Sequence, residues 1–144
     1  CRSALLRAVL VVAPVLVAAV REICVTGIAL KLILETGILQ TPQRVRAACA
    51  LGLAEGVDFL KTSTGKVAVN ATLEASALML DAIAEHGGEC GIKVAGGIRT
   101  LQQAEAYLAQ ATDKFGTSWV TARHFRIGAS SLFGELLAAI PATS

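Results

Sequence analysis

The sequence is poor in aromatic residues and in charge. Aromatic residues make up 4% of the 144 residues and charged residues 17%, whereas hydrophobic residues make up 54%. This composition excludes a disordered chain, and the length suits one domain with a core of its own. The basic residues are scattered, without interleaved aromatic residues, and the formal net charge is only +2. A nucleic-acid-binding surface is therefore not expected.

Metal and redox motifs are also missing. The four cysteines are Cys1, Cys24, Cys49 and Cys90. No two of them have the C-x-x-C spacing of a zinc or thiol–disulfide site, and the two histidines, His86 and His124, are far apart in the sequence. We therefore expect no metal site, and reduced, mostly buried thiols in a cytoplasmic protein.

The longest charge-free segment covers residues 8–20, with Arg7 before it and Arg21 after it. Its 13 residues are too few to span a bilayer, which takes about 20. The basic residues before it would also suit the core of a signal peptide, but no convincing cleavage site follows. A buried helix is the favoured interpretation, in which Pro14 bends the helix or marks its start. No membrane partner is expected.

Past residue 28, short apolar segments alternate with amphipathic ones. The expected strands are residues 28–37, 57–65, 90–97 and 124–130. The expected helices are residues 41–56, 70–88, 100–116 and 131–140, with caps at Thr41, at Asn70 or Thr72, and at Thr100. Apolar strands that alternate with helices in this way predict a parallel sheet covered by helices.

Two α/β architectures fit this order, a doubly wound sheet and a (β/α) barrel. Each expected strand ends in polar, glycine-rich sequence, and a barrel gathers the ends of all its strands at one face. A complete eight-stranded barrel needs at least about 200 residues. We therefore predict that residues 1–144 form a single, partial (β/α)8 TIM-barrel domain of about four βα units preceded by one helix.

A lysine lies at the end of each of two consecutive expected strands, Lys61 in the second and Lys93 in the third. Neighbouring strands are about 4.8 Å apart, so the two ammonium groups are expected within Coulombic range. Desolvation and a nearby cation both lower the pKa of a lysine, and a neutral amine can attack a carbonyl to form a Schiff base. A single lysine of this kind is usually a surface charge, but two at matching strand ends favour a shared site.

The loops after these strands are suited to an anion. AGGIRT (95–100) supplies Gly96, Gly97 and Arg99 before a helix, and GASS (128–131) supplies glycine and serine at the start of another. Helix N-termini with such residues bind anions, and the last loops of barrels often hold phosphate. The residues alone thus predict a barrel-like site for a phosphorylated carbonyl compound.

Four segments carry a family resemblance. They are KLILETG (31–37), VDFLKTSTGKVAVNAT (57–72), GIKVAGGIRT (91–100) and HFRIGASSL (124–132). In this order they resemble 2-deoxyribose-5-phosphate aldolase, a class I aldolase with a (β/α)8 barrel. The resemblance runs from about Leu30 to Leu137, and the helix before it, around residues 15–24, is similar too.

The resemblance implies a role for each matching residue. Lys61 matches the lysine that forms the Schiff base, and Lys93 matches the lysine that lowers its pKa. The positions that match the phosphate pocket are Gly65, Lys66, Gly96, Gly97, Arg99, Gly128, Ser130 and Ser131. The family cleaves 2-deoxy-D-ribose 5-phosphate reversibly to glyceraldehyde 3-phosphate and acetaldehyde. It uses no metal or diffusible cofactor.

One part of the family pattern has no counterpart here. The family relays protons through an aspartate on an earlier strand, and the first four strands with that aspartate are expected to be absent. Asp58 is a poor substitute, because its odd spacing from Lys61 places it on the other face of an extended strand. Glu35, at the end of the first expected strand, is a further candidate to face the site.

Three interpretations follow from this difference. The chain is the C-terminal half of an aldolase, or a half-barrel that binds phosphorylated sugars without turnover, or a remnant that pairs with another half-barrel. An open half-barrel exposes two strand edges and an apolar inner face. The expected partners are therefore a small phosphorylated sugar and either further copies of the chain or an N-terminal half-barrel.

Overall fold

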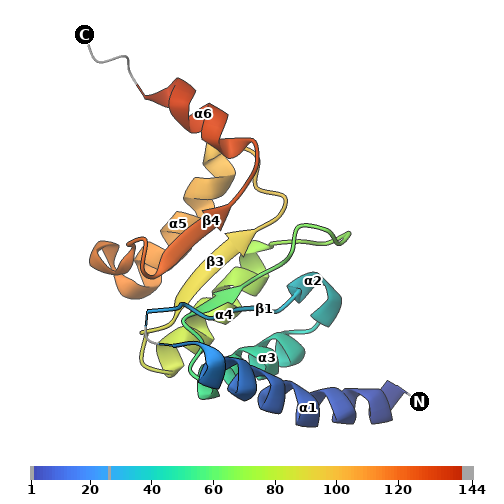
Figure 1. Ribbon diagram of the computed structural model, residues 1–144. Coiled ribbons are helices and arrows are strands. Elements are labelled where there is room, and N and C mark those ends of the chain that lie inside the picture. Colours follow the sequence, from blue (N-terminus) through green and yellow to red (C-terminus); the bar gives the residue numbers. More distant parts are fainter. Residues whose placement is uncertain (1, 26, 141–144) are drawn as a thin grey trace.

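The structure is a computed structural model that describes residues 2–25 and 27–140. Within this part of the chain, a parallel sheet of four strands runs in sequence order, β1-β2-β3-β4 (Figure 1). The strands are β1 (Lys31–Ile33), β2 (Phe59–Lys61), β3 (Gly91–Ala95) and β4 (Phe125–Gly128). A doubly wound sheet reverses its strand order at a switch point, whereas a barrel keeps it. The unbroken order is that of a partial (β/α)8 barrel.

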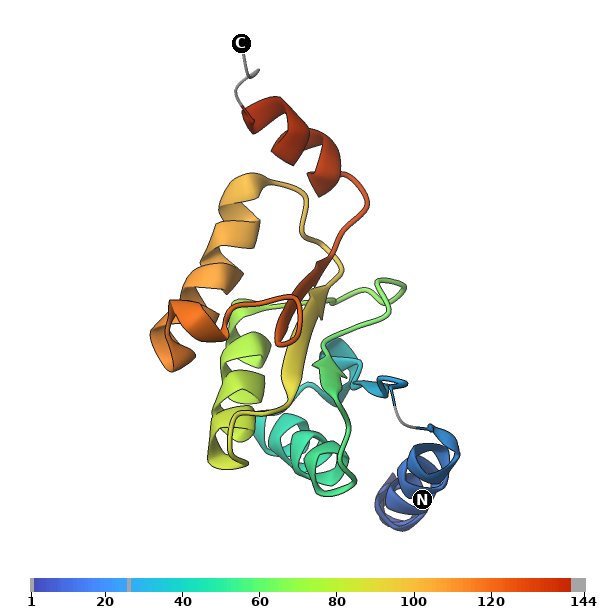
Figure 2. The same ribbon diagram turned by 60° about the vertical axis from the view of Figure 1, so that its left-hand side comes forward.

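The helices lie mainly on one side of this sheet. α3 (Pro42–Ala54), α4 (Leu73–Glu85) and α5 (Leu101–Phe115) follow the first three strands and cover the same face (Figures 1 and 2). α1 (Arg2–Ile23) packs beside α3, and α6 (Leu132–Ala139) extends beyond the end of β4. The other face of the sheet, which would be the inner face of a barrel, carries no helix of the described chain (Figure 2).

Local sequence explains where the helices begin. The hydroxyls of Thr41, Thr72 and Thr100 each accept a hydrogen bond from the amide three residues later, which satisfies one of the free N–H groups of a first turn. Gln103 completes a capping box with Thr100. The caps at Thr41 and Thr100 are confirmed, and of the two alternatives for α4 it is Thr72, not Asn70, that caps the helix.

The core fills the space between the sheet and the covering helices. Leu60 of β2 and Ile92 and Val94 of β3 are completely buried, as are Met79 and Ile83 of α4. These side chains alternate along the strands with those of the open face, as the pleat requires.

One expectation about a single element is wrong, and one short element was not predicted. The first strand is shorter than residues 28–37, because the backbone of Glu35 adopts a left-handed conformation with φ 54° and the chain then turns into the short helix α2 (Thr36–Leu39). A short 3-10 helix, η1 (Thr117–Trp119), lies ahead of β4.

The first helix is present, and over residues 13–23 much of it is exposed rather than buried. The exposed fractions of Val15, Leu16 and Ile23 are 66%, 60% and 78%, and the main contact of α1 with the covering helices is the one with α3. Pro14 lies inside α1 and does not mark its start. No helix of the described chain has the length and apolar character needed to cross a membrane.

Candidate active site

The register of the sheet brings the two predicted lysines together. Lys61 of β2 is the direct partner of Lys93 of β3, and Lys93 is the direct partner of Arg126 of β4. Side chains at the same level of a parallel sheet point to the same face. Both lysines therefore leave the sheet on its open face, where no covering helix lies.

The environment of Lys93 disfavours its charge. Partial burial of its side chain is the main cause of a lowered pKa, and the charges of Lys31, Lys61 and Arg126 act in the same direction. Lys31 lies two residues before Ile33, the partner of Lys61, and thus on the same face. The repulsion among these cations therefore contributes to the lowered pKa of Lys93.

Small residues make room for these long side chains. A Cβ atom on Gly128 would lie 2.9 Å from Cε of Lys93, so the glycine lets the lysine stem cross β4. A Cβ atom on Gly91 would lie 2.5 Å from the ring of Phe59. The guanidinium of Arg126 sits 4.1 Å from the centre of that ring and covers it.

Hydrogen bonds fix the loop that follows Lys61. The buried hydroxyl of Thr62 donates to the carbonyl of Ala95 at 3.1 Å and accepts from its amide at 3.0 Å. The hydroxyl of Ser63 donates to the side chain of Asn70 at 2.8 Å and accepts from the amide of Gly65 at 2.9 Å. The loop is thus tied to β3 and to the start of the next segment.

The side chain of Glu35 is hydrogen-bonded to this loop. Its carboxylate accepts hydrogen bonds from the hydroxyl of Thr64 at 2.7 Å and from the amide of Thr64 at 3.2 Å. The hydroxyl bond is the main reason that the pKa of Glu35 is lowered. Desolvation opposes this shift, and the Thr64 amide, Ser63 and the charge of Lys61 support it.

The residues predicted to bind phosphate lie on three loops at the carboxyl end of the sheet. Gly65 approaches Gly96 closely, since a Cβ atom on Gly65 would lie 3.9 Å from Cα of Gly96. Gly96 and Gly97 both have positive φ, 91° and 81°, which favours glycine there. Lys66, Arg99, Ser130 and Ser131 are exposed.

The third of these loops follows β4. It lies next to the end of β3, because Ala95 and Gly128 are partners in the sheet. Ser131 precedes α6 without a hydrogen bond from its side chain to the helix.

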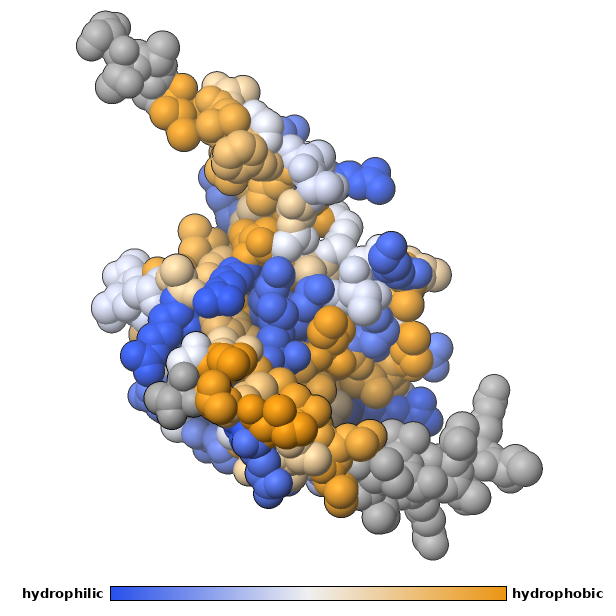
Figure 3. Space-filling model, viewed as in Figure 1, coloured by the Kyte–Doolittle hydropathy of each residue, from blue (hydrophilic) through white to orange (hydrophobic). Residues whose placement is uncertain are grey.

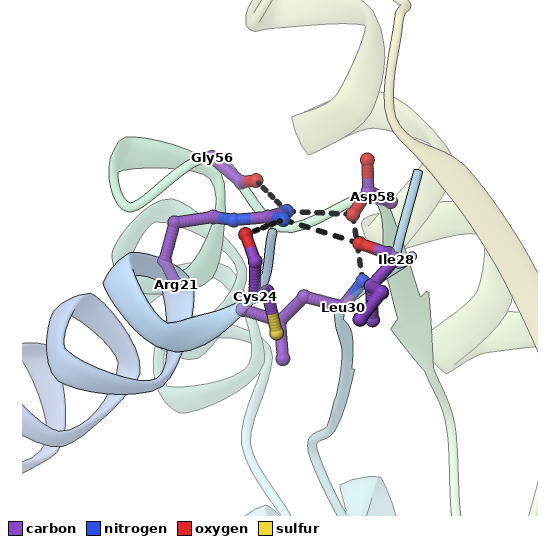
Figure 4. A network of polar contacts seen from close by, with 6 residues as sticks. All are labelled: Arg21, Cys24, Ile28, Leu30, Gly56 and Asp58. Carbon is purple, nitrogen blue, oxygen red and sulfur yellow. Dashed lines mark hydrogen bonds and ion pairs between the residues drawn. The ribbon is translucent and has the colours of Figure 1, made fainter. Parts of the chain in front are cut away.

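Asp58 does not serve this face. Its carboxylate pairs with Arg21 at 2.7 Å and accepts from the amide of Leu30 at 2.7 Å, before β2 begins (Figure 4). Burial acts to raise its pKa, but the Leu30 and Arg21 contacts outweigh burial and lower it. Arg21 also donates to the carbonyls of Gly56 and Ile28, so Asp58 anchors α1 to the amino end of the sheet.

Sequence reasoning missed two cations of the open face, Lys31 and Arg126. Gly128 and Glu35 were both recognised as candidates for the site. Arg126 lies an even number of residues from Gly128, and Lys31 lies an even number of residues from Glu35. Alternation along a strand could therefore have placed them on the same face. Among the described residues no group of three or more His, Cys, Asp or Glu side chains is arranged to hold a metal ion.

Comparison with solved structures supports the fold. An apo-form structure of a Toxoplasma gondii ME49 protein, provisionally named deoxyribose-phosphate aldolase, superposes with a TM-score of 0.81 at 29% identity, covering 91% of this chain and 52% of that one. A Coccidioides immitis protein with the same provisional name gives 0.69 at 30% identity, covering 84% and 44%. The chain thus spans about half the length of these similar proteins.

The sequence also matches a family profile along most of its length. The matching residues are 13–132, and the family is described as DeoC/LacD family aldolase. This range contains all four strands and the three loops that follow the last three of them. The chain therefore belongs to the DeoC/LacD aldolase family.

Proposed function

We propose that this chain carries the Schiff-base half of a class I aldolase that cleaves 2-deoxy-D-ribose 5-phosphate reversibly to D-glyceraldehyde 3-phosphate and acetaldehyde. The observation that carries the proposal is the register that makes Lys61 and Lys93 direct partners on the open face. The named substrate rests on the resemblance of the motifs and on the provisional names of the similar structures.

The chemistry begins at Lys61. Its neutral amine attacks the C1 aldehyde, and loss of water gives an imine. A base removes the proton of the C3 hydroxyl, the C2–C3 bond breaks, and its electrons move to the imine nitrogen as an enamine forms. Glyceraldehyde 3-phosphate leaves, C2 is protonated, and water releases acetaldehyde and Lys61. Because the imine accepts the electrons, the step requires no metal or diffusible cofactor.

Lys93 supports this sequence from the position opposite Lys61 in the sheet. Its own lowered pKa makes it a suitable group to exchange a proton with the substrate near neutral pH.

The phosphate is proposed to lie across the three loops at the carboxyl end. The N–H groups of Gly96 and Gly97 face it, Gly65 lies beside Gly96, and the charges of Lys66 and Arg99 balance it. At the end of β4, Gly128 leaves room for the stem of Lys93, and Ser130 and Ser131 add hydroxyls at the start of α6.

Reductive trapping tests the imine. Borohydride added with acetaldehyde should fix an adduct on Lys61, located by mass spectrometry of the digested protein. The variant Lys61→Arg should lose this adduct entirely, whereas Lys114→Arg, which changes an exposed lysine on α5, should keep it. An adduct spread evenly over surface lysines would contradict the proposal.

A second function, phosphate binding without turnover, is favoured by one observation. In this half of a barrel the loop of residues 62–66 keeps the hydrogen bonds of Thr62 to Ala95, of Thr64 to Glu35 and of Gly65 to Ser63. A chain that gives no adduct but gains thermal stability with inorganic phosphate would have this function.

The open face and its edges are proposed to be covered by a partner. Hydrophilic atoms gather over the middle of this side of the molecule, with hydrophobic patches toward α6 and the end of α1 (Figure 3). A cavity of about 380 Å³, lined mainly by apolar side chains of α1, β1 and α3, opens beside β1. Exposed apolar side chains include Ile23, Ile33, Phe133 and Leu137.

Charge distinguishes between the candidate partners. The open face presents Lys31, Lys61, Lys93 and Arg126, and Glu35 lies at its rim. A second copy would enclose as many cations again, and burying like charges is costly. A half-barrel with carboxylates on its inner strands is the better fit. Native mass spectrometry of the purified chain should show no stable dimer of two copies.

Because Cys24, Cys49 and Cys90 are free thiols, a reducing compartment such as the cytoplasm is proposed.

A further inference from the structure

The turn that follows β1, residues 35–37, supports the loop that follows β2; we call this turn the corner. On the backbone, the amide of Leu34 donates to the carbonyl of Lys61 and the amide of Thr36 donates to the carbonyl of Thr62, both at 2.9 Å. A Cβ atom on Gly37 would lie 1.9 Å from the carbonyl oxygen of Val69, so this corner is in direct contact with the far end of the loop.

The side chain of Glu35 completes this support. Its carboxylate holds both the amide and the hydroxyl of Thr64, and the same hydroxyl accepts the amide of Lys66 at 3.3 Å. A chain of hydrogen bonds therefore runs from Lys66 through Thr64 to Glu35. Glu35 makes these contacts from a left-handed backbone conformation, φ 54°, which is uncommon for a residue other than glycine.

We propose that Glu35 is a positioning residue, which fixes Thr64 and through it the backbone of Lys66, so that the charged side chain of Lys66 is placed for the phosphate of the substrate. The inference rests on the proposed function for the identity of the anion. Both carboxylate oxygens are engaged by Thr64, so Glu35 holds the loop and does not relay the substrate's proton. The lowered pKa of Glu35 favours its ionised form, which accepts from both the amide and the hydroxyl of Thr64.

The experiment compares variants that remove or keep this support. Glu35→Ala and Thr64→Val remove it, whereas Glu35→Gln and Thr64→Ser keep an acceptor and a hydroxyl. Glu105→Ala removes an exposed carboxylate from α5 and is the matched control. The dissociation constant for inorganic phosphate is measured by calorimetry, the trapping of acetaldehyde on Lys61 by mass spectrometry, and amide hydrogen exchange at Thr64 and Lys66 by NMR.

Glu35→Ala and Thr64→Val should each weaken phosphate binding about tenfold, the loss expected for one charge-assisted hydrogen bond. Trapping with acetaldehyde, which has no phosphate, should slow by no more than about threefold. Glu35→Gln and Thr64→Ser should bind phosphate within about threefold of the wild type. Amide exchange at Thr64 and Lys66 should accelerate in the first pair and not in the second.

Two results would overturn the inference. One is wild-type phosphate affinity and amide exchange in Glu35→Ala. The other is a loss in Glu35→Gln as large as in Glu35→Ala, because the glutamine keeps an acceptor for Thr64 and the affinity would then not depend on that hydrogen bond. A wild-type chain that neither traps acetaldehyde nor binds phosphate would refute the proposed function instead. The exchange rates of Thr64 and Lys66 would then decide by themselves whether Glu35 fixes the loop.

Discussion

The two faces of the sheet differ in what they contain, although the same short strands supply both. Toward α4, Leu60, Ile92 and Val94 are completely buried. Toward the open side, Ile33 is 40% exposed and its neighbours at the same level are the cations Lys61 and Lys93. The face toward the helices is packed with apolar side chains, whereas the open face carries positive charges that repel one another.

This difference separates stability from chemistry. Alternation along a strand lets β3 bury Ile92 and Val94 while it presents Lys93, so a residue of the core lies on each side of the functional one. The packed neighbours hold the backbone of Lys93, and the backbone sets where the amine emerges. The open face can then tolerate a cluster of cations that repel one another.

The largest effect on stability should come from the packed face. Leu60→Ala removes a fully buried side chain between the sheet and its helices, and should lower the free energy of unfolding by about 2–5 kcal/mol. Ile33→Ala, on the open face beside Lys61, should cost about 1 kcal/mol or less, because its side chain is already partly in water. Urea unfolding followed by circular dichroism measures both. Equal losses would contradict the distinction between the faces.

A smaller effect should come from the glycine that accommodates Lys93. In Gly128→Ala the new methyl group would lie 2.9 Å from Cε of Lys93 and 3.0 Å from Cβ of Ala95. The lysine must move aside, and the crowding should cost about 1–3 kcal/mol.

Gly134 in α6 is the matched control for Gly128. A Cβ atom there meets nothing within 4 Å, so Gly134→Ala should stabilise the chain by about 0.5–1 kcal/mol through helix propensity. Thermal unfolding of the two variants should therefore shift in opposite directions.

The sequence was sufficient for the order of elements and for two residues of the site. The βα alternation and the caps at Thr41 and Thr100 depend on neighbouring residues of the sequence, and the structure contains both. Lys61 and Lys93 could be paired because each was placed in a strand, although only Lys61 ends one and Lys93 lies in the middle of β3. The turn at Glu35 depends on hydrogen bonds to Thr64, 29 residues away, which no local pattern contains.

Exposure and register were harder to foresee for the same reason. The apolar character of α1 was clear, but whether it is buried depends on which elements pack around it, and its main contact with the covering helices is the one with α3. Alternation could place Lys31 and Arg126 on one face, but their levels relative to Lys61 and Lys93 depend on the pairing of β1 with β2 and of β3 with β4.

The smallest effect is expected within the cation cluster itself. Lys31→Met removes one of the charges that lower the pKa of Lys93, and this pKa should therefore rise toward its ordinary value of 10.5 without reaching it, because burial remains. A titration of Lys93 by NMR measures the change. Lys66→Met, which removes a lysine that does not contribute to this shift, is the control.

The same shift has a consequence for stability. Because the pKa of Lys93 is lower in the folded chain than in the unfolded one, the unfolded chain binds the extra proton at pH values between the two. The contribution of Lys93 to stability is therefore unfavourable below its folded pKa, and this penalty is lost as the pH rises toward 10.5. In Lys31→Met the rise of stability with pH should be shallower than in the wild type, since the two pKa values of Lys93 lie closer together. An unchanged slope would mean that the cations of the open face do not act on one another, and the contrast between the two faces would then rest on burial alone.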